Sequence, residues 1–159
     1  MNDEQFTVDG TLIQAWASQK SFQSKNVSDN GDGPNFHGQR RSKKTHESTT
    51  DADARLYKKS YGKESKLSYL VHALVENRNG LIAAAMVTHA DGYAINLSRR
   101  WLVEKGFEWL KQISSLRQVK LRGLEKVDWL FVFNCTAHNL IRLPRLMAQP
   151  PEMLRKKCA

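Results

Sequence analysis

A pattern of paired strands between residues 66 and 88 constrains the fold of this chain more than any other feature. The segment from Lys66 to Glu76 reads KLSYLVHALVE and is apolar on both faces when extended. Such a strand lies inside a sheet that is covered on each side. Asn79-Gly80 is a strong hairpin signal because both residues accept positive φ, and 81–88 supplies a returning strand. We therefore expect a β-hairpin over 66–88, with His72 packed in it and not acting as a ligand.

A shorter strand is expected near the beginning of the sequence. Gln5 to Asp9 reads as extended, Gly10 follows, and Leu12 to Ala17 is expected to form a helical turn or two. An aspartate that ends a strand projects its carboxylate from the rim of a sheet, where metal ligands often sit. Asp9 is therefore a candidate ligand, and the alternative is an ordinary turn aspartate.

The segment 19–65 is polar and has few apolar residues, so we expect either disorder or a long functional loop. His37, His46, Asp51 and Asp53 have metal-ligating side chains, but no spacing fixes their geometry. The segment also holds the densest basic cluster of the chain, which suits DNA phosphates or is simply a solvated charge run. The candidate DNA contacts in this cluster are Arg40, Arg41, Lys43 and Lys44.

A helical region is expected over 93–147, with a first helical run from Ser98 to Ser115. Arg100, Glu104 and Lys111 stand at i, i+4 and i+11, on one face of that helix. Taken alone, they are a surface ion pair and a nearby cation. The neighbouring stripe is apolar and predicts packing on a core; it consists of Val103, Phe107, Leu110 and Ile113.

A basic connector follows from Leu116 to Gly123, and its candidate phosphate contacts are Arg117, Lys120 and Arg122. The last apolar segment, from Leu124 to about Leu143, is expected to be a buried helix that ends before Pro144.

Charge and cysteine content limit the partners and the compartment. The 159 residues carry a formal charge of +9, which favours a polyanion such as nucleic acid. Cys135 and Cys158 have neither zinc-like spacing nor a disulfide framework, which fits a reduced, cytoplasmic protein. No apolar run is long enough to span a bilayer, so no membrane partner is expected.

Several segments, in sequence order, resemble transposases of bacterial insertion sequences that carry a DDE active site. In the first half of the chain these segments are FTVDGTLI (6–13), AWAS (15–18), FHG (36–38), RS (41–42), TH (45–46), STTD (48–51), DARL (53–56) and HALVENRNGL (72–81). In the second half they are Phe107 with Trp109 to Lys111, Leu116-Arg117, Arg122 to Leu124, and NLIRLP (139–144).

The resemblance implies an incomplete RNase H-like α/β fold: a strand, the long polar loop, the hairpin and C-terminal helices. It also implies DNA transposition with two Mg²⁺ ions held by carboxylates. Asp9 corresponds to the first catalytic and metal-binding carboxylate, and Glu104 to the last. Arg100 and Lys111, in the family spacing R-x3-E-x6-K, correspond to DNA contacts. The implied partners are the inverted-repeat ends of the element and intact transposase subunits.

Departures from the family pattern predict a truncated and internally deleted copy. The second Asp is absent, Leu97 replaces a usual Tyr, and Asp91-Gly92-Tyr93 joins parts that are not adjacent in the family. The helical region expected before the first strand is also missing. Asp91 is close in sequence to the missing Asp but is expected at the wrong place in the fold. We therefore expect a catalytically defective remnant; the alternatives are a non-catalytic DNA-binding or transposase-inhibiting fragment, and a poorly folded product without a role.

Overall fold

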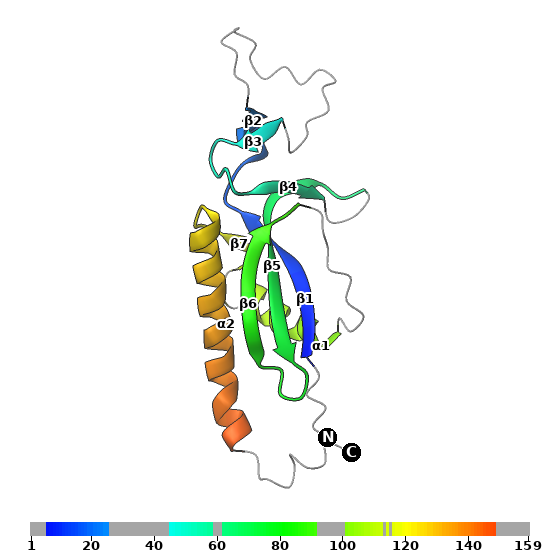
Figure 1. The fold of residues 1–159 in the computed structure, drawn as a ribbon, viewed down its shortest axis with the longest axis vertical. Helices are drawn as coiled ribbons and strands as arrows, with labels where there is room; N and C mark the ends of the chain where they lie inside the picture. Colours follow the sequence, from blue (N-terminus) through cyan, green and yellow to red (C-terminus); the bar gives the residue numbers. More distant parts are fainter. Residues whose placement is uncertain are drawn as a thin grey trace.

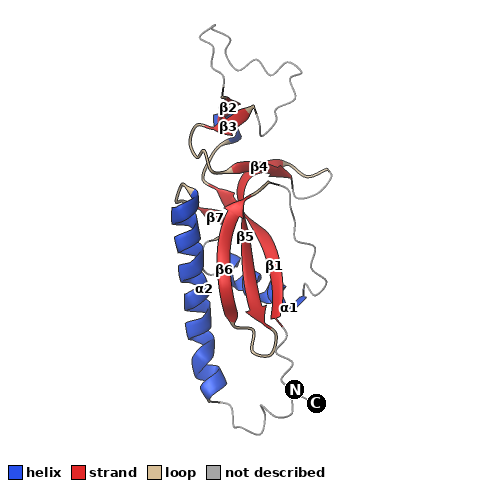
Figure 2. Cartoon of the chain, in the orientation of Figure 1, coloured by secondary structure: helices blue, strands red, loops and turns tan. Residues whose placement is uncertain are grey.

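The computed structural model describes residues 6–25, 45–58, 62–91, 101–112, 114 and 116–148, with only the backbone of 101–106. Its elements in chain order are β1 (Phe6–Ala15), η1 (Gln19–Ser21), β2 (Phe22–Ser24), β3 (His46–Ser48), β4 (Arg55–Lys58), β5 (Ser65–Glu76), β6 (Ile82–His89), α1 (Trp101–Gln112), β7 (Gln118–Val119) and α2 (Leu124–Met147). Figure 1 shows a curved sheet with α1 behind it and α2 alongside β6. The fold is mixed α/β (Figure 2).

The long strand β5 is the centre of the main sheet. It pairs with β1 along one edge in antiparallel register, with Asp9 opposite Ala73. Along its other edge it pairs first with β4 and then with β6, both antiparallel. The short strand β7 adds to β1 in parallel at Gln14 and Ala15. The β-hairpin predicted over 66–88 is confirmed, because β5 and β6 are joined by a turn at residues 77–80 with Gly80 at φ 68°.

The prediction for the first strand is wrong in its extent. β1 continues through Gly10 to Ala15, and the expected helical turn over 12–17 is absent from this described segment. The strand persists because β5 pairs with it as far as Gln14 and β7 pairs with its last two residues. Gly10 fits within the strand because a Cβ there would lie 3.3 Å from His72 Nδ1 and from the Val71 carbonyl oxygen. Asp9 therefore projects from within a strand and not from its end.

The two faces of β5 differ in burial. Leu67, Tyr69, Val71, Ala73 and Val75 alternate on one face and are all buried in the core. The other face carries Leu70, His72 and Leu74, which are only half-buried. The strand is thus fully covered on one side within the described part of the chain, where the sequence pattern had predicted cover on both.

The polar segment 19–65 contains regular structure in its described parts, so the expectation of disorder or a long loop does not hold for those parts. β2 pairs with β3, and β4 joins the main sheet. These pieces are held by small contacts: Phe22 and Ala54 are buried, and the hydroxyls of Ser21 and Ser48 lie 2.7 Å apart. The basic cluster at Arg40, Arg41, Lys43 and Lys44 lies outside the described residues.

Helix α1 covers part of the predicted run 98–115, and its apolar stripe is buried where side chains are described, at Phe107 and Leu110. The basic connector contains β7, whose Val119 is buried with neighbouring Leu116.

Two features of α2 correct the predictions. The helix does not stop before Pro144 but continues to Met147. Pro144 has no N–H to donate to the Leu140 carbonyl, yet the amide of Ala148 donates to the Pro144 carbonyl, so helical bonding resumes after the proline. The helix is also not buried all round: Val127, Phe131, Cys135 and His138 face the core, whereas Trp129 and Phe133 are exposed.

Candidate active-site face of the sheet

Asp9 lies on the covered face of the sheet, on which α1 packs. It shares this face of β1 with Thr7, Thr11 and Ile13, because every second residue of a strand points to the same side. Ile13 belongs to the core together with Phe107 and Leu110 of α1. Asp9 is partly buried, and its carboxylate accepts a hydrogen bond from the Gly10 amide at 2.7 Å. This carboxylate therefore borders the seam between β1 and α1.

Lys111 ties α1 to β1 beside Asp9. Its ammonium group donates a hydrogen bond to the Thr11 hydroxyl. Thr11 is two residues from Asp9 on the same strand face, a rise of about 7 Å. The structure therefore brings together the positions of Asp9 and Lys111, which are 102 residues apart in the sequence.

The other two predicted site residues on this helix are placed less fully. Glu104 lies in α1 two helical turns before Lys111, about 10 Å along the axis, and its side chain is outside the described set. Arg100 precedes the described part of the helix.

A second cluster of ionisable groups anchors the N-terminus of α2. The Tyr69 hydroxyl donates to both carboxylate oxygens of Asp51 at 2.7 Å. The Gly123 amide donates to Asp51 Oδ1 at 3.3 Å and to the Tyr69 hydroxyl oxygen at 3.2 Å. Asp53 accepts from the Leu124 amide at 2.9 Å. Since the first amides of a helix lack partners within the helix, these two aspartates act as caps supplied from another segment.

The electrostatics of this cluster follow from its contacts. The amide of Leu124 and the ring of His89, whose Nε2 lies 3.3 Å from Asp53, hold the pKa of Asp53 below its ordinary value. Burial, and then the Asp51 carboxylate, raise the pKa of Tyr69 far above its usual range. Asp51 and Asp53 therefore stabilise the start of α2. His46, grouped with them in the sequence as a metal-ligating side chain, stacks instead on Phe22, with 5.6 Å between the ring centres. The sequence signal that was missed is the D-x-D segment together with Gly123, which has φ 89° just before an apolar helix.

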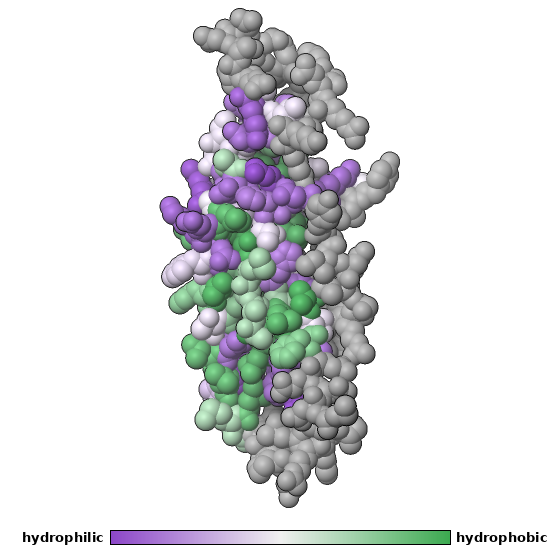
Figure 3. Space-filling model, viewed as in Figure 1, coloured by the Kyte–Doolittle hydropathy of each residue, from purple (hydrophilic) through white to green (hydrophobic). Residues whose placement is uncertain are grey.

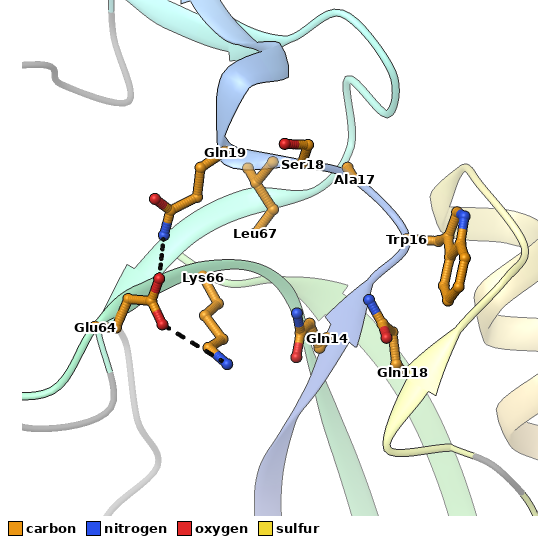
Figure 4. A pocket seen from close by; sticks show the side chains of 9 residues that line it. All are labelled: Gln14, Trp16, Ala17, Ser18, Gln19, Glu64, Lys66, Leu67 and Gln118. Atoms are coloured by element: carbon orange, nitrogen blue, oxygen red, sulfur yellow. Dashed lines mark hydrogen bonds and ion pairs between the residues drawn. The ribbon is translucent and has the colours of Figure 1, made fainter. Parts of the chain in front are cut away.

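The basic connector presents its cations to solvent. Arg117, Lys120 and Arg122 are all exposed, while the connector is held to the sheet by β7. The Lys120 ammonium lies 5.9 Å from the centre of the exposed Trp16 ring. Beside it is an open pocket of about 390 Å³, lined by residues from β1, β5, β7 and the adjoining loops (Figure 4). Asp9 and Lys111 are not in the lining of this pocket.

Comparison with known proteins identifies the family. The family described as "Transposase DDE domain" matches residues 59–144, more than half of the 159 residues. The chain belongs to this family. No curated protein and no solved structure matches significantly. The match in this transposase-family chain includes the hairpin, Glu104, Lys111 and the connector, and Asp9 precedes it.

The described acidic side chains of this DDE-family chain do not fit a complete two-metal site. Among the residues the structure describes, no three His, Cys, Asp or Glu side chains are grouped so as to hold a metal ion. Asp51 and Asp53 cap α2, and the Glu76 carboxylate accepts the amides of Arg78 and Asn79. A DDE centre needs carboxylates that hold two ions roughly 3.5 to 4 Å apart.

Asp91 lies too far from Asp9 for the two carboxylates to share a metal site. Through the sheet register, Asp9 is level with Ala73 and Ala85. Asp91 follows six residues later, beyond the end of β6, which corresponds to about 20 Å along the strand direction. Its carboxylate lies instead 4.0 Å from the Arg55 guanidinium.

In the described part of the chain, no helix is long and apolar enough to cross a membrane.

Proposed function

We propose that this chain is a DNA-binding, catalytically defective derivative of an insertion-sequence transposase. Its partners are then the inverted-repeat ends of the element, and its sheet is an incomplete RNase H-like unit. The observation that carries the proposal is the seam between β1 and α1, where Lys111 contacts Thr11 next to Asp9 and where the described side chains form no three-residue metal-binding group. This arrangement keeps a cation beside the first acidic position of the family, and its described side chains do not supply the ligands for two metal ions.

Charge supports the binding half of the proposal. The chain has 25 Lys and Arg against 16 Asp and Glu, and counterion release favours its binding to DNA. Arg117, Lys120 and Arg122 form an exposed basic surface on a connector fixed by the sheet, which suits phosphate contacts. The proposed DNA contacts also include five cations that lie outside the described residues: Arg40, Arg41, Lys43, Lys44 and Arg100.

Loss of the second Asp supports the catalytic half. With an internal deletion at residues 91–93, Asp9 and Glu104 remain as the two carboxylates carried over from the family. Two acidic residues supply too few bridging oxygens for a pair of Mg²⁺ ions, so strand cleavage is expected to be severely impaired.

DNA binding is tested by fluorescence anisotropy with duplexes from the sequences that flank the gene, over a range of salt concentrations. Replacement of Arg117, Lys120 and Arg122 by Gln is expected to weaken binding and to reduce the slope of log affinity against log salt by about 3, since each phosphate contact contributes about 0.9. The flanking duplex and an unrelated duplex compared in parallel measure sequence preference.

A triple variant of matched charge provides the control. Lys20, Lys63 and Arg78 are exposed cations outside the connector, and replacing them by Gln removes the same three charges. Equal losses in the two triple variants would show that only net charge matters. No binding by the parent protein at low salt would contradict the proposed function.

A further inference from the structure

The outward face of α2 is an apolar surface that the rest of the described chain leaves uncovered. Trp129, Phe133, Leu140 and Met147 are 64%, 57%, 62% and 83% exposed, and the rings of Trp129 and Phe133 stack at 5.4 Å. The opposite side of the same helix packs on the core through Val127 and Phe131. Figure 3 shows hydrophobic side chains gathered over the lower part of α2.

The spacing of these side chains is that of a helix-pairing seam. Successive positions are separated by four, three, four, three and four residues; we call them the α2 seam, and they are Trp129, Phe133, Thr136, Leu140, Leu143 and Met147. Such alternation keeps one stripe facing a partner helix over more than two heptads. Thr136, the polar member, donates its hydroxyl to the Val132 carbonyl at 3.0 Å. Burying it would therefore leave no unsatisfied donor.

We propose that the α2 seam is the interface of a homodimer, in which α2 of a second copy packs antiparallel against it. In this arrangement Trp129 of one copy meets Met147 of the other, Phe133 meets Leu143, and Thr136 meets Leu140. Each contact occurs twice because a two-fold axis makes the interface self-complementary. The dimer is then layered as sheet, helix, helix, sheet.

The residues beside the seam favour a second copy over a charged partner. In the antiparallel pair Leu130 lies beside Pro144, Val132 beside Leu146, and Ala137 beside its own symmetry mate. None of these side chains carries a charge, so none selects a partner of opposite charge or repels its own copy.

The direction of the two helices is set by their ends. Glu125 is in the first turn of α2 and Arg145 in its last turn. An antiparallel pair brings Glu125 of one copy toward Arg145 of the other and opposes the helix dipoles. A parallel pair aligns the dipoles and places Arg145 on the same side as Arg145 of the other copy.

The exposed area is sufficient for a specific, modest dimer. Large apolar side chains with these exposed fractions present about 500 Å² per copy, which is in the range of the largest apolar patch on a typical monomer, a patch that is often functional. Pairing two copies would bury about 1,000 Å² in total, near the lower limit for specific interfaces. The dimer is therefore expected to dissociate on dilution.

Sedimentation velocity of the full chain over a wide concentration range tests the proposal. The parent is expected to be in monomer–dimer equilibrium, and Leu140→Glu is expected to raise the dissociation constant about 100-fold, because each dimer carries the change twice. Ile141→Glu is the matched control: Ile141 is 53% exposed on the same helix but lies off the seam. This variant is expected to dimerise like the parent. Far-UV circular dichroism checks that both variants are folded.

Cross-linking tests the orientation in a Cys158→Ser background, in which Cys135 is buried and its pKa is raised to about 12 by burial. A mixture of Phe133→Cys and Leu143→Cys proteins is expected to form a disulfide-linked heterodimer, whereas Leu143→Cys alone is not. Cross-linking of Leu143→Cys with itself would overturn the antiparallel pairing. A monomeric parent at all concentrations, equal behaviour of Leu140→Glu and Ile141→Glu, or open-ended oligomers would overturn the α2 seam as a dimer interface.

Discussion

Asn139 joins α2 to the edge of β6, and its removal should cost more than any other single polar contact of that helix. Its Oδ1 accepts from the Ile82 amide and its Nδ2 donates to the Ile82 carbonyl, both at 2.8 Å. Asn139 thus satisfies both backbone groups of a buried residue on the strand edge that faces away from β5. Asp128 does the same for the Val87 amide at 2.7 Å.

The magnitude follows from these two bonds. Asn139→Ala leaves a donor and an acceptor of Ile82 without partners, and each costs about 1 to 3 kcal/mol when buried. The higher helix propensity of alanine stabilises the variant by roughly 0.5 kcal/mol and offsets part of this loss. These contributions sum to about 1.5 to 5.5 kcal/mol. Because both hydrogen bonds are only partly buried, we expect a net loss in the lower half of that range, about 2 to 3 kcal/mol in the free energy of unfolding, and a fall of about 5 to 10 °C in Tm.

Urea denaturation followed by circular dichroism measures this loss, with Asn134→Ala as the control. Asn134 is on the same helix, but its Nδ2 donates only to the Leu130 carbonyl within the helix. Its replacement should change the free energy of unfolding by less than about 0.5 kcal/mol, because no backbone group of another element loses a partner. If the two variants were equally stable, the pairing of α2 with the β6 edge would be refuted.

The remaining predictions concern the sheet, the α2 cap and two buried ionisable groups. Gly10→Val should destabilise the protein by about 1 to 3 kcal/mol in urea titrations, because its Cβ would press on the Val71 carbonyl, 3.3 Å away; a neutral effect would contradict the close packing of β1 on β5. Asp53→Ala should cost about 1 kcal/mol by loss of the cap on Leu124, whereas Asp53→Asn should cost less. Because the pKa of Asp53 is lowered on folding, this contribution should be present above the unfolded pKa and lost as pH falls through the folded pKa, so thermal unfolding of wild type and Asp53→Asn should converge in acid. Burial lowers the pKa of His72, so the unfolded state takes up its proton first as pH falls below about 6.5; acidification should reduce stability, and less so in His72→Gln. Cys135, with its raised pKa, should react with a thiol reagent in the Cys158→Ser protein only after denaturant is added.

The elements with strong local signals were predictable from the sequence. The β5–β6 hairpin follows from its apolar strands and from Gly80 in a positive-φ turn, and both helices follow from apolar periodicity. The extent of β1 was not predictable, because Gly10 punctuates the sequence but fits against His72 in the sheet. Pairing with β5 and β7 overrides a local stop signal, and pairing is not visible in a short window of sequence.

The candidate site was predictable in part. The family resemblance pointed to Asp9 and Lys111, and the structure brings their positions to one seam through the Lys111–Thr11 bond. The roles of Asp51 and Asp53 as caps of a helix 71 residues further on depend on tertiary contacts that no spacing rule gives. The exposure of the outward face of α2 was not predictable either. A long apolar run predicts a buried helix, and only the tertiary structure shows that the sheet covers one side of it.

A nicking assay with Mg²⁺ or Mn²⁺ on supercoiled DNA that carries the flanking sequences, with DNA binding measured in the same samples, tests the central claim most directly. The account predicts that the chain binds this DNA and does not cut it. Metal-dependent cleavage that is lost in both Asp9→Asn and Glu104→Gln, yet retained in Asp91→Asn, would contradict it.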